Sequence, residues 1–593
     1  MAHAGDLLAE LLSRYQVTHV FGQPGGQTVA LYDGIARRVP KIRHVLVRDE
    51  RSAAYSADAY ARLTGRPGVC DVTVGPGTTK LADGLVESLN ASVPVIALVG
   101  ELPRDWAPYR DFGVASQGFD QVRFLTSITK STLLVPSLVA LPQMVRAAFR
   151  IATTGRPGPV ALVVPHDVLD AEWDGADAAV AVDDRYVRSP AHRPVASDDT
   201  LQAAVALLHK SRRPLIVAGG GVHASRATVE LADLAERLDA VVVTSLSGKG
   251  AMDETGPRAA GVLNPLGTTE SLELVRKADL VFWCGTKVGQ NTSHNWTIPY
   301  EGQATIHLDA DATELGRTFR PTVALNGDAR STLAALLKAL PAEARPAWRT
   351  EVARAKEHGA GQRSEAEGSD AAPILPPRLM HDLATRLLPD DVVISDASFA
   401  AGWIAAHIPA RNAGRNFLFA RGQGGLGYAV PAAIGAAVAR PEGRVVTVSG
   451  DGGFSYAIGE LATHAQQGLR TVNVVLNNGT LSWLAMYEHL FFDGLSQDVE
   501  LEGELLSPDF AAVAEGLGCY GIRVERPDEI AAALDAAFAA TRPVVVDVRT
   551  DRNSTPIHSY ARRLSEGRHF PRPGTVYELV EWRQSPPEPP TDS

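Results

Sequence analysis

Two polar segments follow buried strand patterns and carry residue types that suit a metal-bound diphosphate. Residues 443–448 form a β-branched run that leads to Gly450-Asp451-Gly452-Gly453, and a second apolar run, residues 472–476, leads to Asn477-Asn478. Strands of a parallel sheet that is covered on both faces have this continuous apolar character. A carboxylate and an amide carbonyl are hard oxygen ligands for Mg²⁺, and glycines let backbone N–H groups approach phosphate oxygens. A GDGG turn alone is equally typical of an ordinary strand–turn–helix, so the argument depends on both segments together.

A second candidate for chemistry is Glu50, which stands where another predicted strand, residues 43–48, ends. Residues 52–62 then predict a helix rich in alanine and serine, which permits close packing against neighbouring backbone. A partly buried carboxyl group at such a position can act as a general acid or base. The alternative interpretation is a solvated or helix-capping carboxylate.

Length and composition limit the class of protein. The chain has 593 residues, 45% of them hydrophobic, which is too long for one core and fits three or four α/β domains. A net charge of −11 argues against nonspecific nucleic-acid binding. The sequence contains no apolar run of some 18 residues, so we expect no membrane-spanning helix. The pattern of the N-terminal residues indicates an amphipathic helix and not a signal peptide. Three widely spaced cysteines offer no disulfide framework, so we expect a reducing cytoplasm.

The alternation of strand and helix patterns predicts three doubly wound, parallel-sheet α/β domains and a C-terminal extension. We place them at residues 1–170, 200–340 and 371–550, with the extension at 551–593. A segment rich in proline and aspartate, about residues 170–199, and a charged segment, 356–370, are expected to be linkers. Glycine turns after the strands of the second domain suit a nucleotide, although such turns alone are a weak signal.

Together these segments resemble the acetolactate synthase-like group of the thiamine diphosphate (ThDP) enzymes. The likeness lies in FGQPGG (residues 21–26), RDE (48–50) and GPGTT (75–79), and in the spacing from GDG to Asn477-Asn478. The resemblance implies a pyrimidine-binding, a central Rossmann-like and a diphosphate-binding domain. It also implies that Mg²⁺ is held by the side chains of Asp451 and Asn478 and by the backbone carbonyl of Thr480. The full cofactor-binding set that it implies is Gly25, Glu50, Pro76, Ser398, Gly424, Leu426, Gly450, Asp451, Gly452, Gly453, Asn478, Thr480 and Leu481.

The resemblance assigns three residues to catalysis. Glu50 would contact N1′ of the aminopyrimidine and promote the tautomer that activates the thiazolium C2. Leu426 would hold the cofactor bent, although ordinary core packing explains a leucine there equally well. Gln117, in the segment ASQGFDQ, matches a glutamine that reaches the reacting centre, or it is a loop-stabilising amide.

The substrate side is less defined. Trp483, Tyr487 and Glu488 match a segment that faces the substrate in relatives, with a packing role as the alternative. Asp49 and Lys80 stand where the group commonly has His and Asn, and Ser116 replaces a bulky aromatic. These departures weaken any transfer of substrate identity.

The reaction predicted from the resemblance is decarboxylation of a 2-keto acid followed by carboligation. One alternative is a 2-hydroxyacyl-CoA lyase or oxalyl-CoA decarboxylase-like enzyme, and another is a pyruvate oxidase-like enzyme with FAD. The central domain would hold FAD, the ADP part of coenzyme A, or nothing. The resemblance implies a homodimer or homotetramer with ThDP between subunits. The basic C-terminal tail is a solvated arm, a subunit brace or a lid over the site.

Overall fold

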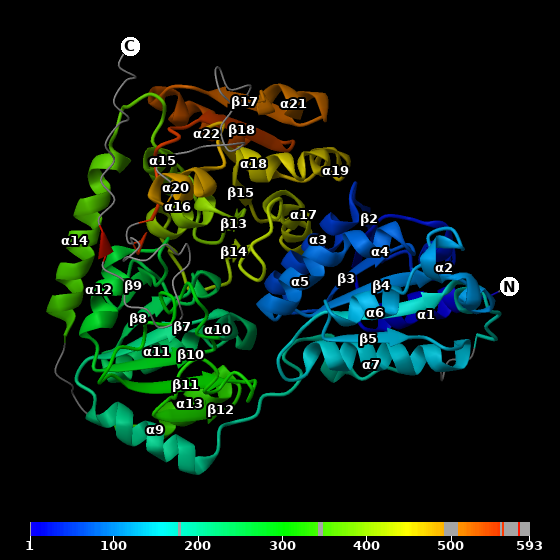
Figure 1. The fold of residues 1–593 in the computed structure, drawn as a ribbon, viewed down its shortest axis with the longest axis horizontal. Coiled ribbons are helices and arrows are strands. Elements are labelled where there is room, and N and C mark those ends of the chain that lie inside the picture. Colours follow the sequence, from blue (N-terminus) through cyan, green and yellow to red (C-terminus); the bar gives the residue numbers. More distant parts are fainter. Residues whose placement is uncertain are drawn as a thin grey trace.

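The computed structural model describes residues 2–175, 180–341, 348–491 and 508–557, together with the backbone of 560–561 and 579–580. The side chains of residues 487–491 are outside this description. Three six-stranded parallel sheets dominate the molecule, each wound on both faces by helices (Figure 1). The prediction of three doubly wound α/β units is confirmed, and each range expected for a domain encloses one of the sheets. In the described part of the chain, no helix is both long and apolar enough to cross a bilayer.

The N-terminal sheet has the strand order β2-β1-β3-β4-β6-β5. Its order reverses direction next to β1, which is typical of a doubly wound sheet that collects binding residues at the carboxyl ends of its strands. The elements are α1 (Ala4–Arg14), β1 (His19–Gly22), α2 (Val29–Arg38), β2 (Arg43–Leu46), α3 (Glu50–Thr64), β3 (Gly68–Val72), α4 (Pro76–Lys80), α5 (Ala82–Ala91), β4 (Val95–Glu101), α6 (Gln121–Thr126), β5 (Ser131–Leu134), α7 (Leu141–Thr153), β6 (Val160–Pro165) and α8 (His166–Leu169).

The segment expected to be the first linker packs onto this unit. Trp173, Val180 and Val187 are buried in the same apolar cluster as α1 and α7. Apolar side chains at irregular spacing therefore pack the segment onto the N-terminal core. The sequence analysis did not predict this packing, because the segment is rich in proline and aspartate and has no regular apolar pattern.

The central sheet has the order β12-β11-β10-β7-β8-β9. Its elements are α9 (Asp198–Lys210), β7 (Pro214–Ala218), α10 (Gly220–Ser225), α11 (Thr228–Leu238), β8 (Val241–Thr244), β9 (Ala259–Val262), α12 (Thr269–Lys277), β10 (Leu280–Cys284), β11 (Ala304–Asp309), β12 (Val323–Asn326) and α13 (Ala329–Ala339). The charged segment expected to be the second linker belongs to a 19-residue helix, α14 (Arg349–Glu367). Arg363 of α14 pairs with Glu270 of α12 at 3.1 Å, so this helix lies against the central unit.

The C-terminal sheet has the order β14-β13-β15-β16-β18-β17. Its elements are α15 (Pro376–Arg386), β13 (Val392–Ser395), α16 (Phe399–His407), β14 (Phe417–Phe419), α17 (Ala429–Ala439), β15 (Val445–Gly450), α18 (Asp451–Ser455), α19 (Leu461–Gln466), β16 (Thr471–Asn477), α20 (Ser482–Phe491), α21 (Phe510–Gly516), β17 (Tyr520–Val524), α22 (Ile530–Ala539) and β18 (Val544–Arg549). Two short strands of the extension, β19 (Tyr560–Ala561) and β20 (Leu579–Val580), pair antiparallel.

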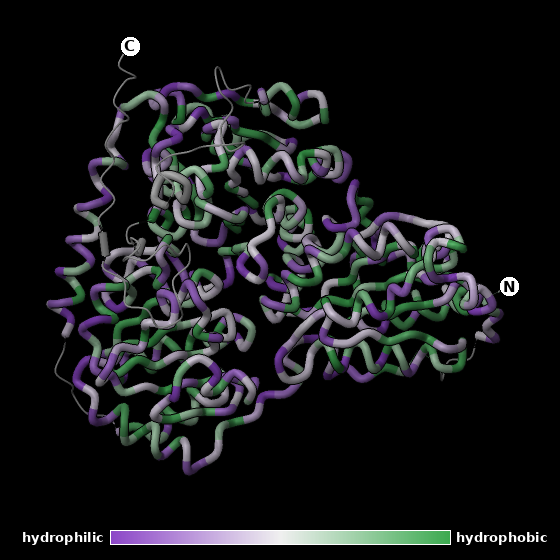
Figure 2. Tube along the Cα trace, viewed as in Figure 1, coloured by the Kyte–Doolittle hydropathy of each residue, from purple (hydrophilic) through white to green (hydrophobic). Residues whose placement is uncertain are grey.

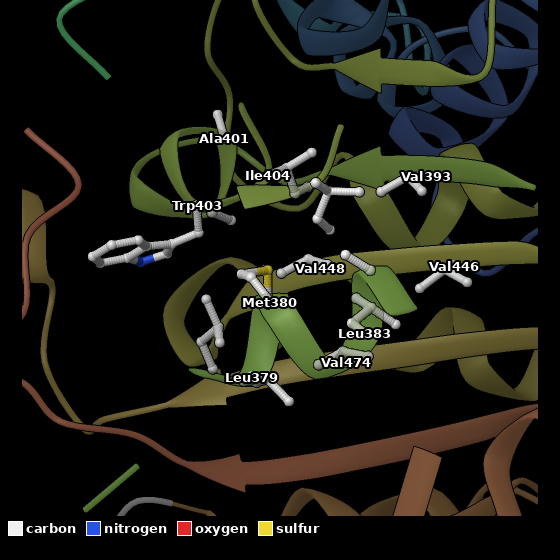
Figure 3. Close-up of a cluster of buried hydrophobic side chains, with 14 of the residues drawn as sticks. Leu379, Met380, Leu383, Val393, Ala401, Trp403, Ile404, Val446, Val448 and Val474 are labelled. Carbon is white, nitrogen blue, oxygen red and sulfur yellow. The ribbon is translucent and has the colours of Figure 1, made fainter. Parts of the chain in front are cut away.

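The strands of the C-terminal sheet are apolar on both faces because helices cover both. Val446 and Val448 of β15 face the cluster built with α15 and α16, which includes Met380 and Trp403 (Figure 3). Val445, on the opposite face, packs against α17. The hydropathy tube shows the same arrangement in each unit, with hydrophobic strands inside and hydrophilic helix faces outside (Figure 2). This burial fixes where the polar turns at the strand ends must lie.

Candidate active site

The turns after β15 and β16 meet at one edge of the C-terminal sheet. The two strands are paired in register, with Gly450 opposite Leu476. Asp451 begins α18, and its carboxylate accepts hydrogen bonds from the backbone N–H of Gly452 at 2.7 Å and of Gly479 at 2.5 Å. One carboxylate therefore joins the two turns.

Asn478 completes an oxygen-rich corner beside Asp451. Its Oδ1 accepts a hydrogen bond from the Thr480 N–H at 3.1 Å, and its Nδ2 donates to Ser482 Oγ at 2.8 Å. Burial raises the pKa of Asp451, and hydrogen bonds from the backbone of Gly479 and Gly452 oppose this shift. A carboxylate, an amide oxygen and a backbone carbonyl form a donor set that fits Mg²⁺.

These turns line a cavity of about 60 Å³ that brings together residues far apart in the sequence. Gly452 lies on its wall close to Leu481, where a Cβ would be 2.9 Å from Leu481 Cδ2. Nine of the residues predicted to bind the cofactor or metal line the cavity, namely Ser398, Leu426, Gly450, Asp451, Gly452, Gly453, Asn478, Thr480 and Leu481. Glycine turns at the strand ends next to this oxygen donor set fit a diphosphate with its metal ion.

Asp396 holds the loop that carries Leu426. Its buried carboxylate accepts hydrogen bonds from the backbone N–H groups of Ala397, Gly427 and Ala429, at 2.9, 3.0 and 3.0 Å. Gly427 has φ +83°, and a Cβ there would lie 2.7 Å from Tyr456 Cβ. Sequence analysis missed Asp396, although its place directly after a predicted strand and two residues before Ser398 was a usable signal.

Leu426 and Gly424 occupy this loop as predicted. Leu426 is partly buried and packs against the cluster that contains Tyr428, so it has a packing contact as well as a place on the cavity wall. Gly424 has φ +83° and no heavy atom within 4 Å of where a Cβ would stand. The backbone of the loop is therefore accessible at Gly424.

Ser398 is the non-glycine residue of this cavity with a strained backbone. Its φ of 69° and ψ of −144° lie in a region that L-residues rarely adopt, and its side chain makes no capping hydrogen bond to α16. Such strain costs about 1–3 kcal/mol and is concentrated at functional sites. The geometry turns the start of α16 toward the cavity.

Glu50 begins α3, and its side chain is buried. Lys80 Nζ lies 3.1 Å from Glu50 Oε2 and 3.6 Å from a carboxylate oxygen of Asp49. Two of the three residues that depart from the family pattern, Asp49 and Lys80, therefore contact each other at the predicted catalytic carboxylate. The side-chain hydrogen bond to Glu50 is the first cause of a raised Lys80 pKa.

Gln117 approaches the same edge of the N-terminal sheet. A Cβ at Gly75 would lie 2.6 Å from the Gln117 carbonyl oxygen, and Gln117 itself has φ +66°. Pro76 is the first residue of α4, directly after this contact. Gly25 lies on the loop after β1, where a Cβ would be 2.2 Å from Thr73 Cβ.

Glu460 fixes the start of α3 against the C-terminal unit, although more than 400 residues separate them. Its Oε1 accepts hydrogen bonds from the backbone N–H groups of Arg48 at 2.9 Å and Asp49 at 3.1 Å. The same carboxylate accepts from Thr463 Oγ1 at 2.8 Å. Sequence analysis did not single out Glu460, because nothing in its local sequence distinguishes it.

The cavity around Asp451 does not bring the two halves of the predicted site together. Every described residue that lines the Asp451 cavity lies between Pro376 and Ser554, and none comes from the N-terminal unit. Glu50 therefore lies outside the cavity that holds Asp451 and Leu426.

The predicted substrate residues are only partly described. Trp483 packs edge-on against Phe399, with ring centroids 5.7 Å apart, which is the packing role left open by the sequence. Tyr487 and Glu488 lie on α20, but their side chains fall outside the described residues. The basic residues of the tail also fall outside it, so the lid remains a prediction.

A larger cavity of about 380 Å³ opens between the central unit and its neighbours. Gly220, Gly221 and Gly285, from turns that follow β7 and β10, line it. Lys287 also lines it, donates a hydrogen bond to the Asn90 carbonyl oxygen, and has a pKa lowered to about 8 mainly by burial. The cavity lies where a nucleotide was expected in the central domain.

Three family models match the chain in the expected order. They describe thiamine pyrophosphate enzymes: the N-terminal TPP binding domain over residues 2–124, the central domain over 201–336 and the C-terminal TPP binding domain over 396–548. The chain belongs to the thiamine pyrophosphate enzymes. Thiamine pyrophosphate is another name for ThDP, so the predicted family and its dependence on this cofactor are confirmed.

Among relatives of this ThDP enzyme are acetolactate synthase large subunits. It is 33% identical over 557 residues to a probable acetolactate synthase large subunit of Methanocaldococcus jannaschii, over 92% of this chain and 91% of the relative. It is 31% identical over 538 residues to the acetolactate synthase isozyme 2 large subunit of Escherichia coli, over 90% and 93% of the chains. A probable 2-ketoarginine decarboxylase of Pseudomonas aeruginosa is 34% identical over 557 residues, over 92% and 94%. The chain is thus an acetolactate synthase-like ThDP enzyme.

Proposed function

We propose that this enzyme uses ThDP and Mg²⁺ to decarboxylate a 2-keto acid and join the remaining fragment to a second carbonyl compound. The convergence of nine predicted cofactor residues in one cavity carries the proposal. The similarity to acetolactate synthase large subunits supports carboligation as the outcome.

The chain's residues divide the work as follows. Asp451, Asn478 and the Thr480 carbonyl would hold Mg²⁺, and the glycine turn that begins α18 would lie against the diphosphate. Glu50 would exchange a proton with the aminopyrimidine, and Leu426 would hold the cofactor rings in a productive orientation. ThDP, when bound, supplies a nucleophilic carbon and an electron sink, while the protein supplies orientation and a dry site.

We further propose that the working site forms between two copies of the chain, in a homodimer or a homotetramer. The cavity around Asp451 lacks residues of the N-terminal unit, which supports Glu50 arriving from a second copy. The loop leading to Gln117 exposes large apolar side chains, with Trp106 at 50%, Tyr109 at 58% and Phe112 at 102% exposure. A second copy would bury this surface.

A second candidate is decarboxylation of a larger 2-keto acid without carboligation. The similarity to a probable 2-ketoarginine decarboxylase favours it, and the exposed side chain of Ser116 leaves room for a larger substrate. The 380 Å³ central cavity is also a candidate site for FAD or for coenzyme A. A pyruvate oxidase-like activity would require FAD, and an acyl-CoA lyase would require coenzyme A.

The three buried free thiols, Cys70, Cys284 and Cys519, support a cytoplasmic location.

The test is turnover of pyruvate by protein loaded with ThDP and Mg²⁺, assayed together for acetolactate, acetaldehyde, CO₂ and hydrogen peroxide. Acetolactate is the expected product. Acetaldehyde and CO₂ without acetolactate would overturn carboligation of pyruvate and favour simple decarboxylation. Peroxide from a yellow protein would favour the oxidase, and thermal stabilisation by coenzyme A would favour the lyase. Inactivity with pyruvate directs the same assay to 2-ketoarginine.

A further inference from the structure

A separate cavity of about 210 Å³ lies where all three units meet. The end of α3 and the start of β4 form one side, the end of α10 forms a second, and Gly414, Arg415 and Arg440 form the third. Four arginines, Arg62, Arg226, Arg415 and Arg440, line this junction cavity. No aspartate or glutamate is among the described residues of its wall.

Only one of these arginines has its charge balanced by the protein. Arg62 pairs with Asp58 at 2.6 Å and with Glu87 at 2.9 Å. Among the described residues, no acceptor lies within hydrogen-bond or ion-pair distance of the side chains of Arg226, Arg415 or Arg440. Three of the four arginines that line this cavity therefore have no counter-charge in the part of the chain that the structure describes.

Of the three arginines, Arg415 is the one withdrawn from water, because the side chains of Arg226 and Arg440 are exposed. Arg415 is partly buried, and its pKa is lowered to about 10 by burial and by the charge of Arg62. Arg226 lies over Gly65, where a Cβ would be 2.4 Å from its Nη2, and burial and neighbouring arginines lower its pKa as well. A charge taken out of water is stable only when it is paired and hydrogen-bonded.

Ser189 provides an independent sign of a missing ligand. Its side chain is 7% exposed, and its Oγ has no hydrogen-bond partner. The residue lines the same cavity. Buried hydroxyl groups are nearly always hydrogen-bonded, so an orphaned one next to unpaired guanidinium groups indicates an acceptor that belongs to a ligand.

We propose that the junction cavity binds a compact polyanion, one that carries phosphoryl or several carboxylate groups, through Arg226, Arg415, Arg440 and Ser189. Guanidinium groups match both kinds of oxygen acceptor bidentately. The site is distinct from the Asp451 cavity and from the 380 Å³ central cavity, although it shares Arg415 and a short stretch of wall with the latter. A ligand there contacts all three units and therefore stabilises their arrangement. α3 begins at Glu50 and α17 follows the Leu426 loop, so both catalytic segments adjoin elements that reach this site.

The experiment is a calorimetric titration of the full chain, saturated with ThDP and Mg²⁺, with inorganic phosphate at constant ionic strength. Saturation with cofactor keeps phosphate out of the diphosphate site. We expect binding and a raised thermal midpoint. The double variant R226Q/R440Q is expected to bind at least about tenfold more weakly, since each lost charge-assisted hydrogen bond has an effect of this order. The single variant R440Q, which alters an exposed side chain, should bind phosphate severalfold more weakly. Unchanged thermal midpoints in the absence of phosphate would show that both variants fold.

The matched control is R421Q, because Arg421 lines the central cavity but not the junction cavity. Its affinity for phosphate should equal that of the unaltered protein. The proposal is overturned if phosphate does not bind, if R226Q/R440Q binds as tightly as the unaltered protein, or if R421Q loses as much affinity. A parallel titration with tricarballylate distinguishes the two classes of ligand. Tighter binding of phosphate would indicate a ligand with phosphoryl groups, and tighter binding of tricarballylate would indicate a polycarboxylate.

Discussion

The C-terminal and N-terminal halves of the proposed site differ in how far one chain completes them. Around Asp451, two strand-end turns, the Leu426 loop and Ser398 already share a cavity and a set of hydrogen bonds. Glu50, in contrast, lies outside that cavity and contacts Lys80. The comparison indicates that one domain contains the residues proposed to bind the diphosphate. The proposed proton transfer by Glu50, in contrast, requires that a second surface lie against that domain.

Glu50→Gln gives the largest expected effect, because it removes the proton donor while leaving the C-terminal half intact. We expect ThDP to bind within a fewfold of its normal affinity, while exchange of the C2 proton slows about 10²–10⁴-fold. Proton NMR of the cofactor after quenched deuterium exchange measures the rate. Glu442→Gln, at an exposed side chain, is the matched control. Unchanged exchange in Glu50→Gln would remove Glu50 from its proposed role.

Mixing the two inactive variants Glu50→Gln and Asp451→Asn tests whether the halves come from different chains. If the site forms between copies, a mixed dimer contains one site with both native residues. Denaturing and refolding the two variants together at equal amounts should then restore about a quarter of the normal activity, from random pairing. No recovery, in a mixture shown to form mixed dimers, would mean that each chain completes its own site.

Asp451→Asn should damage the C-terminal half. The substitution removes a charged Mg²⁺ ligand and weakens the acceptor for the Gly452 and Gly479 N–H groups. We expect ThDP to bind about 10–100-fold more weakly in Mg²⁺, as measured by quenching of tryptophan fluorescence. Asp528→Asn, at a side chain 76% exposed, is the control and should bind normally. Normal binding by Asp451→Asn would contradict the proposed metal site.

Acid should weaken metal binding in the same half. Burial raises the pKa of Asp451, so in the cofactor-free protein this carboxyl takes up a proton at a higher pH than an ordinary aspartate. Mg²⁺ binds the ionised form and must displace the proton as the pH falls. The rise in thermal midpoint caused by ThDP and Mg²⁺ should therefore be severalfold smaller at about pH 5 than at pH 7. An equal rise at both pH values would show that Asp451 is not the group that metal and proton share.

Ser398→Gly should have the smallest effect. Glycine adopts φ 69° without the steric cost that serine carries, which more than offsets the greater freedom of glycine in the unfolded chain. We expect the thermal midpoint of the cofactor-free protein to rise by about 1–2 °C, and ThDP to bind severalfold more weakly because the hydroxyl is gone. Ser364→Gly, within α14, should instead lower the midpoint. A lowered midpoint in Ser398→Gly would mean that the strained backbone carries no cost.

The sequence by itself determined the three sheets and most of the C-terminal half of the site. Continuous β-branched runs of four to eight residues are typical of strands covered on both faces, and the carboxyl ends of parallel strands gather the residues that follow them. Asp451 and Asn478 were therefore predictable from neighbouring strands. The helix α14 was not, because its charged sequence has few buried residues to reveal a face.

Only the tertiary structure decided the contacts between residues that no local pattern relates. Glu460 binds the backbone before Glu50, Asp396 holds the Leu426 loop, and Lys80 reaches Glu50 across two helices. The unbalanced arginines of the junction cavity come from the central and C-terminal units, and each looks like an ordinary arginine in its own segment. Periodicity and turn chemistry act over a few residues, whereas burial of a charge beside distant partners exists only once the chain has folded.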